Sequence, residues 1–472
     1  MKSPSIAWNP VSDLQSVRMA DRRHVRRVVA VATRAMAAPA ASFPRMMLDD
    51  GELEGAYRLF SNADVSPDSI LEAHYTAAAR RVRASESPTI MVHDTTDCRF
   101  GGEGAREGIG RISNKGRGLS VHVALALAPD GAPHGLLDVA THTRMAPAAQ
   151  RRRRGEKPHK DRESARWNRT VERAMARLGE GPSQVVHVMD READNYLLWE
   201  SLLESGRAFV IRLSQNRRLA EDEYDFLNEA IEDVAACITR DVQVSRRSDF
   251  NRHLTAKQRH PARLERTARL AIGARTTRIA RSKYNGRIAL KPHLALNVVR
   301  VWEPEPPDGY DPVEWLLLTN LPAASPDQLE VVVDIYRLRW TIEEFFKALK
   351  TGCAFEDRQL ESRHALENAL AILAPIACRL LLLRTLARRR DGTPATDVLT
   401  ETEIEVLRVL SRRHRLPRVP SARDALLAVA GIGGFLKRNG EPGWQTIGRG
   451  FDELVRADRL WRAAKPAPRC DQ

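Results

Sequence analysis

One stretch of the chain, from Asp334 to Lys350, separates apolar from charged side chains at helical spacing. At about 100° per residue, the apolar residues share one face suited to burial: Ile335, Leu338, Ile342, Phe345 and Leu349. The opposite face carries one carboxylate among cationic and hydrogen-bonding groups: Tyr336, Arg339, Glu343, Lys347 and Lys350. Such a face can hold a metal-binding acid against a phosphate backbone. The alternative is a solvated helix whose i,i+4 ion pairs contribute about 0.3–0.5 kcal/mol each.

Two aspartates far upstream are suitable partners for Glu343. Asp94 ends the run TIMVHD and Asp190 ends QVVHVMD, so each is expected at the carboxyl end of a strand. No local motif connects the three acids, and only the fold can bring them together. For either aspartate alone, capping a turn or a following helix is the commoner role, and that alternative stays open.

Three converging carboxylates would require cations. Two carboxylates about 4 Å apart repel by about 4 kcal/mol at an effective dielectric constant of about 20, and a third adds to this. Oxygen ligands of this kind favour Mg²⁺ or Mn²⁺ over zinc. Two such ions about 3.5–4 Å apart activate a water or a 3′-hydroxyl and stabilise the leaving oxygen of a phosphoryl transfer. The acids therefore predict two-metal chemistry without a covalent enzyme nucleophile.

The charge of the chain favours a polyanionic partner. Lysine and arginine outnumber aspartate and glutamate by 75 to 61, giving +14 and a pI near 9.9. Nucleic acid is the first candidate, although a GC-rich genome also enriches arginine. The 5 cysteines are an odd number with no CxxC pair, so neither a zinc knuckle nor a disulfide framework is indicated, and a reducing cytoplasm fits. No apolar signal core is present, and the most apolar run, Ala369 to Leu383, is too short to span a bilayer and is expected to be a buried helix.

The order of expected elements is that of an α/β protein with a ribonuclease-H-like mixed sheet core. A strand ending at Asp94 precedes a hairpin, a helix, a strand ending at Asp190, a further helix and a strand ending near residue 213. The closing helix comes only at Tyr336, so residues 214–322 form a large insertion, expected as a β-rich subdomain before the last catalytic helix. Residues 21–83 are expected to be two basic helices separated by a turn from Pro44 to Asp50.

Several other residues have two possible roles. Trp315 begins the apolar run WLLLTN, so burial is its common role, but an indole near a nucleic-acid site can stack a displaced base for ~1–3 kcal/mol. The run Arg151–Arg154 is either a loop that touches phosphate or a solvated one. A structural or solvent-facing role, with no metal-ligand spacing, is expected for the histidines: His93, His122, His134, His142 and His159.

The sequence resembles the bacterial DDE transposases that carry a YREK signature. Tyr336, Arg339, Glu343 and Lys350 keep the spacing Y-x2-R-x3-E-x6-K. The motifs HDTTD around Asp94 and DREAD from Asp190 resemble the other two acid motifs of that family. Similar segments extend over nearly the whole chain: GAYRLFSN from Gly55, NKGRG from Asn114, FVIR ending at Arg212, WLLLT from Trp315 and GIGGF from Gly431. Departures lie in the N-terminal helices, at Arg151–Arg154 and after Lys350, with Phe346 replacing a polar residue, and they leave the specificity for end sequences open.

The resemblance implies cut-and-paste DNA transposition through nicking, hairpin formation and resolution, and strand transfer into target DNA. It implies that Asp94, Asp190 and Glu343 bind two Mg²⁺ ions, with Mn²⁺ as a substitute. Contacts to transposon-end double-stranded DNA are implied for Tyr336, Arg339, Lys350, Arg212 and Lys347, with Trp315 stacking on a base flipped out during hairpin formation.

The resemblance also implies an organisation of the whole molecule. The expected domains are a helical N-terminal DNA-binding domain (1–72), a catalytic domain (73–372) and a helical C-terminal dimerisation domain (373–472). The protein is expected to act as a homodimer on DNA, in the bacterial cytoplasm at the nucleoid and away from membranes. Two alternatives are a catalytically inactive DNA-binding derivative, which the intact acids argue against, and a nuclease or resolvase without strand transfer, which the YREK face and Trp315 argue against.

Overall fold

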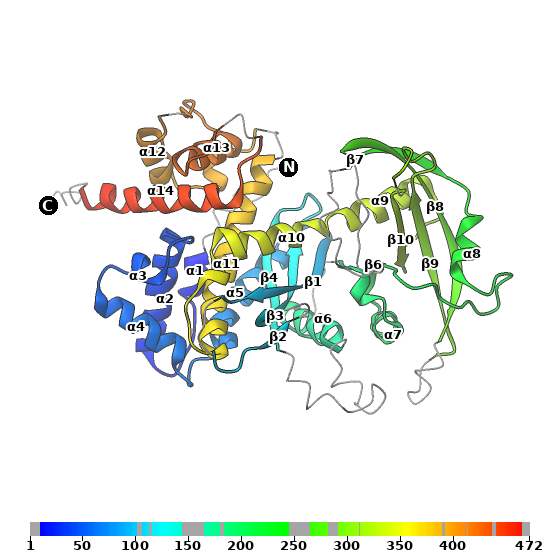
Figure 1. The fold of residues 1–472 in the computed structure, drawn as a ribbon, viewed down its shortest axis with the longest axis horizontal. Helices are drawn as coiled ribbons and strands as arrows, with labels where there is room; N and C mark the ends of the chain where they lie inside the picture. Colours follow the sequence, from blue (N-terminus) through cyan, green and yellow to red (C-terminus); the bar gives the residue numbers. More distant parts are fainter. Residues whose placement is uncertain are drawn as a thin grey trace.

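The computed structural model describes residues 10–101, 106–112, 116–143, 165–179, 184–244, 265–281, 291–310, 312–388, 392–412, 414–436 and 440–464. The run Arg151–Arg154, the histidine at position 159 and Asn114 of the NKGRG segment lie outside these residues. Figure 1 shows N-terminal helices at one end of the molecule, a large sheet that reaches the other end, and a helical C-terminal region beside the N-terminal one.

A mixed sheet forms the centre of the molecule and has the ribonuclease-H-like strand order. Its core strands are β1 (Thr89–Arg99), β3 (Gly116–Leu127), β4 (Pro133–His142), β5 (Val185–Met189) and β6 (Ala208–Arg212). β1 pairs antiparallel with β3, which pairs with β4, and parallel with β5, which pairs parallel with β6. The short strand β2 (Gly110–Ile112) pairs with the start of β3. The predicted α/β fold class is confirmed, with β1 and β5 side by side at the centre.

The inserted strands extend this sheet. They are β7 (Ile238–Val244), β8 (Arg266–Ala280), β9 (His293–Trp302) and β10 (Glu314–Thr319), and the helix α8 (Leu227–Glu232) precedes them. β10 pairs antiparallel with β6, and β9, β8 and β7 follow in order. The insertion is therefore β-rich as predicted, but it continues the core sheet where a separate subdomain was expected. The open edge of β6 explains this, because its unpaired backbone groups are satisfied by β10.

Among the helices that pack on the sheet are α5 (Pro67–Arg83), α6 (Ala165–Leu178) and α7 (Tyr196–Glu204). α5 is fixed to β4 by two buried hydrogen bonds, from the Leu136 N–H to His74 Nε2 (3.1 Å) and from the Val139 N–H to the Tyr75 hydroxyl (3.0 Å). The predicted domain boundary at residue 72 falls inside α5.

The N-terminal region contains more helices than its sequence predicted. They are α1 (Pro10–Leu14), α2 (Arg22–Ala37), α3 (Phe43–Met46) and α4 (Asp50–Ser61). The expected turn from Pro44 to Asp50 is wrong, because α3 occupies part of it and α4 follows. Asp49 begins α4 by accepting a hydrogen bond from the Glu52 N–H (2.8 Å), and Leu59 and Phe60 bury its inner face.

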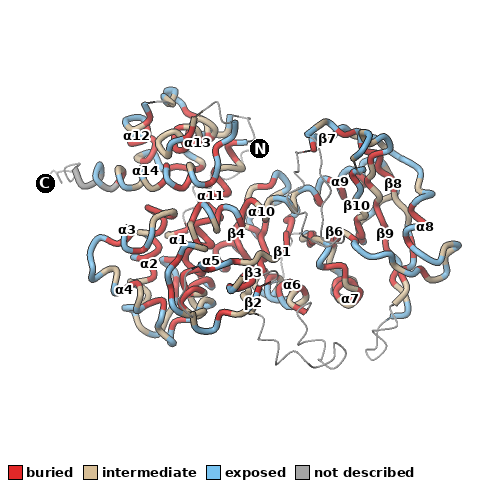
Figure 2. The backbone as a smooth tube through the Cα atoms, viewed as in Figure 1, coloured by how far each residue is buried: buried red, intermediate tan, exposed pale blue. Residues whose placement is uncertain are grey.

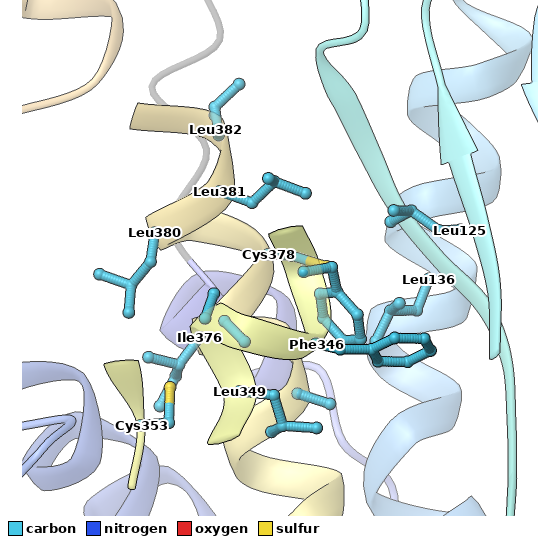
Figure 3. Close-up of a cluster of buried hydrophobic side chains, with 14 of the residues drawn as sticks. Leu125, Leu136, Phe346, Leu349, Cys353, Ile376, Cys378, Leu380, Leu381 and Leu382 are labelled. Atoms are coloured by element: carbon cyan, nitrogen blue, oxygen red, sulfur yellow. The ribbon is translucent and has the colours of Figure 1, made fainter. Parts of the chain in front are cut away.

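The expected single helix from Asp334 to Lys350 is divided into α9 (Pro326–Arg337), α10 (Trp340–Lys347) and a π-helical turn (Ala348–Gly352). At the joint, the Arg339 N–H donates to the carbonyl three residues earlier, that of Tyr336 (3.0 Å). This closes a tighter turn than the i to i−4 bond of a regular α-helix. Ile342, Phe345 and Leu349 are buried as predicted, whereas Ile335 and Leu338 are only half-buried. Figure 3 shows the buried side, where Phe346 and Leu349 lie among side chains of the hairpin and the next helix.

A long buried helix, α11 (Arg363–Arg388), follows a short 3-10 turn (Phe355–Asp357). Every residue of the predicted apolar run, Ala369 to Leu383, is buried, and Figure 2 shows α11 inside the fold. Within the described residues it is the one helix long and apolar enough to cross a membrane, and 89% of its most apolar stretch is buried in the protein. The predicted boundary at residue 372 falls inside it.

The C-terminal region is helical, as expected. After the 3-10 turn Ala395–Asp397 it contains α12 (Glu401–Leu410), α13 (Ala422–Ile432) and α14 (Trp444–Ala464). α14 begins several residues before the predicted Phe451 and lies against the π-helical turn and α2. The last helices therefore cover the segment that follows α10.

Candidate active site

Asp94 and Asp190 lie beside each other at the point where two parallel strands separate. The parallel pairing of β1 and β5 ends at His93 and Met189, and each aspartate is the next residue of its chain segment. The prediction that Asp94 ends its strand is wrong, because β1 continues to Arg99 through its antiparallel pairing with β3. The aspartates still meet at one edge, since that edge is where the parallel ladder ends.

Each aspartate uses one oxygen for a local backbone bond. Asp190 caps a 3-10 turn (Arg191–Ala193), where its Oδ1 accepts the Glu192 N–H at 2.9 Å. Asp94 Oδ1 accepts the Thr95 N–H at 2.7 Å, but the residues after it are strand, so it caps no turn. The capping role is therefore real for Asp190, yet it occupies only one of its two oxygens.

Arg339 joins two of the predicted acids. Its Nη1 lies 3.1 Å from Asp94 Oδ2, and its Nη2 lies 2.5 Å from Glu343 Oε1. The arginine stands in the joint between α9 and α10, and α10 lies against β1. The fold thus brings the helix that carries Glu343 onto the strand that carries Asp94.

The electrostatics of the site show that the other two acids act on Asp94. Burial, followed by the charges of Asp190 and Glu343, raises the pKa of Asp94 to about 7 against the lowering effect of Arg339. Burial lowers the pKa of Arg339, but Tyr336, Glu343 and Asp94 outweigh burial and raise it. The group is therefore a coupled cluster in which negative charge is only partly compensated.

Tyr336, Arg212 and Trp315 form the adjoining wall of the site. Helical spacing placed Tyr336 on the polar face of its helix; the side chain is buried, and burial raises the pKa of its hydroxyl. Arg212 and Tyr336 share a side-chain hydrogen bond, and Arg212 also donates to the Glu314 carbonyl (3.1 Å). The Trp315 ring is half-buried with its centroid 5.9 Å from that of Tyr336.

The two lysines of the predicted polar face point to different places. Lys350 Nζ donates to the Asp97 carbonyl on β1 and lies 3.7 Å from Glu356 Oε1. The solvated-helix alternative would pair Lys347 with Glu343 at i,i+4, but among the described contacts Lys347 Nζ bonds Glu344 Oε1 at 3.0 Å. Its ammonium lies over the exposed Trp340 ring. Glu344 and Glu343 stand three and four residues before Lys347 within α10, so both are in reach, and Glu343 already pairs with Arg339.

The donor set fits divalent cations. It consists of carboxylates, and the pKa of Asp94 is raised by neighbouring negative charge that a cation would offset. Among the described residues no group of three His, Cys, Asp or Glu side chains is already arranged as a metal site, since Arg339 bonds two of the acids. Asp94, Asp190 and Glu343 are the residues that could hold such ions.

Sequence reasoning missed two contributors near the acids. The buried Asp194, the last residue of DREAD, accepts hydrogen bonds from the Ser214 N–H (2.7 Å) and Gln215 N–H (2.9 Å), and so ties the turn after β5 to the end of β6. His187 bonds His93 behind the acids. In the sequence, the only signals for these contributors were their positions close to Asp190: Asp194 four residues after it and His187 three residues before it.

The comparisons with known proteins agree with this arrangement. A transposase DDE domain matches residues 155–380, and a transposase DNA-binding domain matches residues 11–65. Asp190 and Glu343 lie within the first match, while Asp94 lies outside both. Among solved structures, a cryo-EM structure of a piggyBac transposase synaptic complex with hairpin DNA covers 99% of this chain and 77% of its own, with 9% identity and a TM-score of 0.39.

The two matched domains together account for more than half of the chain and occur in the order DNA-binding, then DDE. DDE domains generally use divalent metal ions, which agrees with the carboxylate donor set. The chain therefore contains a domain similar to transposase DDE domains and a domain similar to transposase DNA-binding domains, which supports a DNA-binding enzyme that cuts and transfers strands.

Proposed function

We propose that the protein is a cut-and-paste transposase of the YREK type, which nicks transposon ends, forms and resolves hairpins, and joins the ends to target DNA. The observation that carries the proposal is the coupled acid cluster, in which Arg339 bonds Asp94 and Glu343 and the charge of Asp190 raises the pKa of Asp94. Two Mg²⁺ ions, or Mn²⁺, held by these acids would activate the attacking oxygen and stabilise the leaving one.

The protein groups have separate tasks in this proposal. Asp94 lies on β1 and Asp190 directly follows β5, so the central sheet holds both carboxylates in place. Arg339 fixes Glu343 and limits the repulsion among the acids. Arg212 and Tyr336 stand at the wall of the same site, and they and Lys350 would bind phosphates of the transposon end, with Lys347 as a further contact.

Trp315 would hold a displaced base. Its ring is half-buried beside Tyr336, which leaves part of the indole accessible next to the acids. A base that has left the duplex can stack on such a surface, and hairpin formation is the step that needs it.

We further propose that the protein acts as a homodimer on DNA, bound at the bacterial nucleoid in the cytoplasm. The N-terminal region supplies DNA binding, and the C-terminal helices supply dimerisation. Because the boundaries at 72 and 372 fall inside α5 and α11, the three regions would behave as one folded unit.

The acids can be tested by replacing each with its amide. Asp94→Asn, Asp190→Asn and Glu343→Gln should each abolish Mg²⁺-dependent nicking and leave end binding in gel shifts nearly unchanged, because phosphate contacts lie elsewhere. Asp334→Asn is the matched control, since this exposed acid of α9 pairs only with Arg240 and Arg337 among the described ion pairs. Nicking at the wild-type rate by any amide variant would remove that acid from the proposal. A wild-type protein that binds ends without cutting them would favour the inactive DNA-binding derivative.

A further inference from the structure

Two histidines lie directly behind the acids on the other side of the sheet. His93 precedes Asp94 on β1, and His187 comes three residues before Asp190 on β5. Both side chains are buried, and His93 Nε2 shares a hydrogen bond of 2.9 Å with His187 Nδ1. The bond therefore links the two strands diagonally, from His93 in the last backbone pair (with Met189) to His187, which is in register with Met91 two residues earlier.

Stability alone does not explain this pair. His93 Nδ1 and His187 Nε2 are buried without a hydrogen-bond partner in the described part of the chain, and burying such a group unbonded destabilises the folded protein. Two apolar side chains of the same shape would fill the space without that cost. Burial lowers the pKa of both rings, to about 3 for His187, so an ionic attraction is excluded as well.

The position of the bond gives it a geometric consequence. After His93, β1 pairs only with β3; Asp94, for example, is in register with Val123. The chain after Met189 leaves the sheet and enters the 3-10 turn Arg191–Ala193. A shift of β5 along or away from β1 would therefore move Asp190 relative to Asp94. The last rigid links before the two acids are the backbone pair and the histidine bond.

We propose that the His93–His187 hydrogen bond sets the spacing of Asp94 and Asp190 and thereby the affinity of the site for divalent cations. Both histidines are positioning residues, since they act through the strands and touch no reactant. The inference rests on the proposed two-metal function. Groups that orient metal ligands typically change metal affinity by about 10–100-fold when mutated, and a link one strand residue removed should change it by roughly 3–10-fold.

The test measures cation binding without catalysis. Mn²⁺ is titrated into the full chain in the absence of DNA and followed by electron paramagnetic resonance, with Mg²⁺ as a competitor. His93→Phe/His187→Phe should bind Mn²⁺ roughly 3–10-fold more weakly, while its melting temperature without cation equals or exceeds that of the wild type. His93→Gln/His187→Asn places amide groups near the ring nitrogens and should restore the wild-type Kd.

His122 provides the matched control. Its ring is also buried, and its Nδ1 lies 2.8 Å from Thr95 Oγ1, but that bond joins β1 to β3. The backbone ladder of these strands runs unbroken from Ile90 to Arg99, so register survives loss of the side-chain bond. His122→Phe should therefore change the melting temperature without changing the Kd for Mn²⁺.

A wild-type Kd in the double phenylalanine variant would overturn the inference. If that variant does not fold, His187→Leu is measured in its place. A Kd for Mn²⁺ in His187→Leu equal to that of His93→Gln/His187→Asn would then overturn the inference. A weakened Kd in His122→Phe equal to that of the test variant would also overturn it, because any buried histidine would then have the effect. Failure of the proposed function is recognised separately, since Asp94→Asn would then bind Mn²⁺ as the wild type does.

Discussion

Arg339 determines how three acids can share one site in this protein. Its guanidinium bonds Asp94 at 3.1 Å and Glu343 at 2.5 Å, so one planar group serves two carboxylates on different elements. A lysine could supply the charge but not the two directed bonds. Because Arg339 is the group that lowers the pKa of Asp94 against burial and repulsion, it keeps this carboxylate available at neutral pH.

Replacing Arg339 by glutamine should therefore shift the pH dependence of nicking. The pKa of Asp94 would rise above its value of about 7, and the protonated acid would bind cations poorly. At subsaturating Mg²⁺, activity should be lost on acidification at a higher pH in Arg339→Gln than in the wild type. Nicking rates between pH 6 and 9 measure this. Arg423→Gln is the control, since Arg423 pairs with Glu441 in the C-terminal region, and an unshifted acidic limb in Arg339→Gln would contradict the assignment.

Replacing Trp315 distinguishes a role in base stacking from a role in the hydrophobic core. Trp315→Ala should slow hairpin formation while first-strand nicking stays near the wild-type rate, because only the hairpin step needs a displaced base. Trp167, fully buried on α6, is the comparison, and its truncation should cost about 3–5 kcal/mol and depress every step together. A time course of nicked and hairpin products is recorded beside melting curves. Equal loss of all steps in Trp315→Ala, with a lower melting temperature, would return this residue to the core.

At the scale of elements, periodic patterns predicted which segments form helices and strands, while pairing and local turns decided where they end. β5, β6 and the inserted strands were predictable because each contains an apolar or alternating run, although β8 continues to Ala280, beyond its recognisable run. β1 extends beyond Asp94 because its partner β3 continues, which the sequence of β1 alone does not contain. Helical spacing allows Lys347 to reach either Glu343 or Glu344, and it bonds Glu344 because Arg339 already pairs with Glu343.

Helix packing in the C-terminal region gives an element-scale prediction. A Cβ at Gly450 of α14 would lie 1.8 Å from the Val429 carbonyl oxygen of α13, so the helices touch through backbone there. Gly450→Ala should force them apart and destabilise the protein by about 1–3 kcal/mol or more. Gly443→Ala, where a Cβ meets nothing within 4 Å, should leave the melting temperature nearly unchanged. Equal melting temperatures for both variants would show that α13 and α14 do not pack this closely.

Across the whole molecule, regions far apart in sequence meet behind the catalytic helix. The buried Arg358 donates to the carbonyls of Pro39, Ala41 and Cys353, and so ties the N-terminal helices to the segment after α10. α14 adds a second link, because Asp452 accepts a hydrogen bond from the Ala40 N–H at 3.4 Å. The sequence showed helical termini but gave no sign of these contacts, since isolated polar residues carry no periodic signal. The N-terminal DNA-binding region is thus mechanically connected to the site.

Asp452 makes this connection dependent on pH. Burial raises its pKa from 3.8 to about 7, while Ala40, Arg456 and Arg358 oppose the rise. Between pH 4 and 7 the folded state therefore keeps a proton on Asp452 that the unfolded chain has already released. The contribution of this group to the free energy of unfolding is thus greatest at low pH and falls as the pH rises from 4 to 7, by roughly 2–4 kcal/mol at most. Asp452→Asn imitates the protonated acid and should become more stable than the wild type as pH rises.

The difference in free energy of unfolding between Asp452→Asn and the wild type isolates the effect of Asp452. Asp94 titrates in both proteins, so its contribution cancels in this difference. Denaturant unfolding at pH 4.5 and at pH 8 should give a free-energy difference that grows with pH in favour of the variant. Asp21→Asn is the control, because Arg23 lowers the pKa of this exposed acid to about 2, outside the window. A difference that is constant with pH for Asp452→Asn would mean that Asp452 stays ionised in the folded protein, and the contact between α14 and the N-terminal helices would then have no pH dependence.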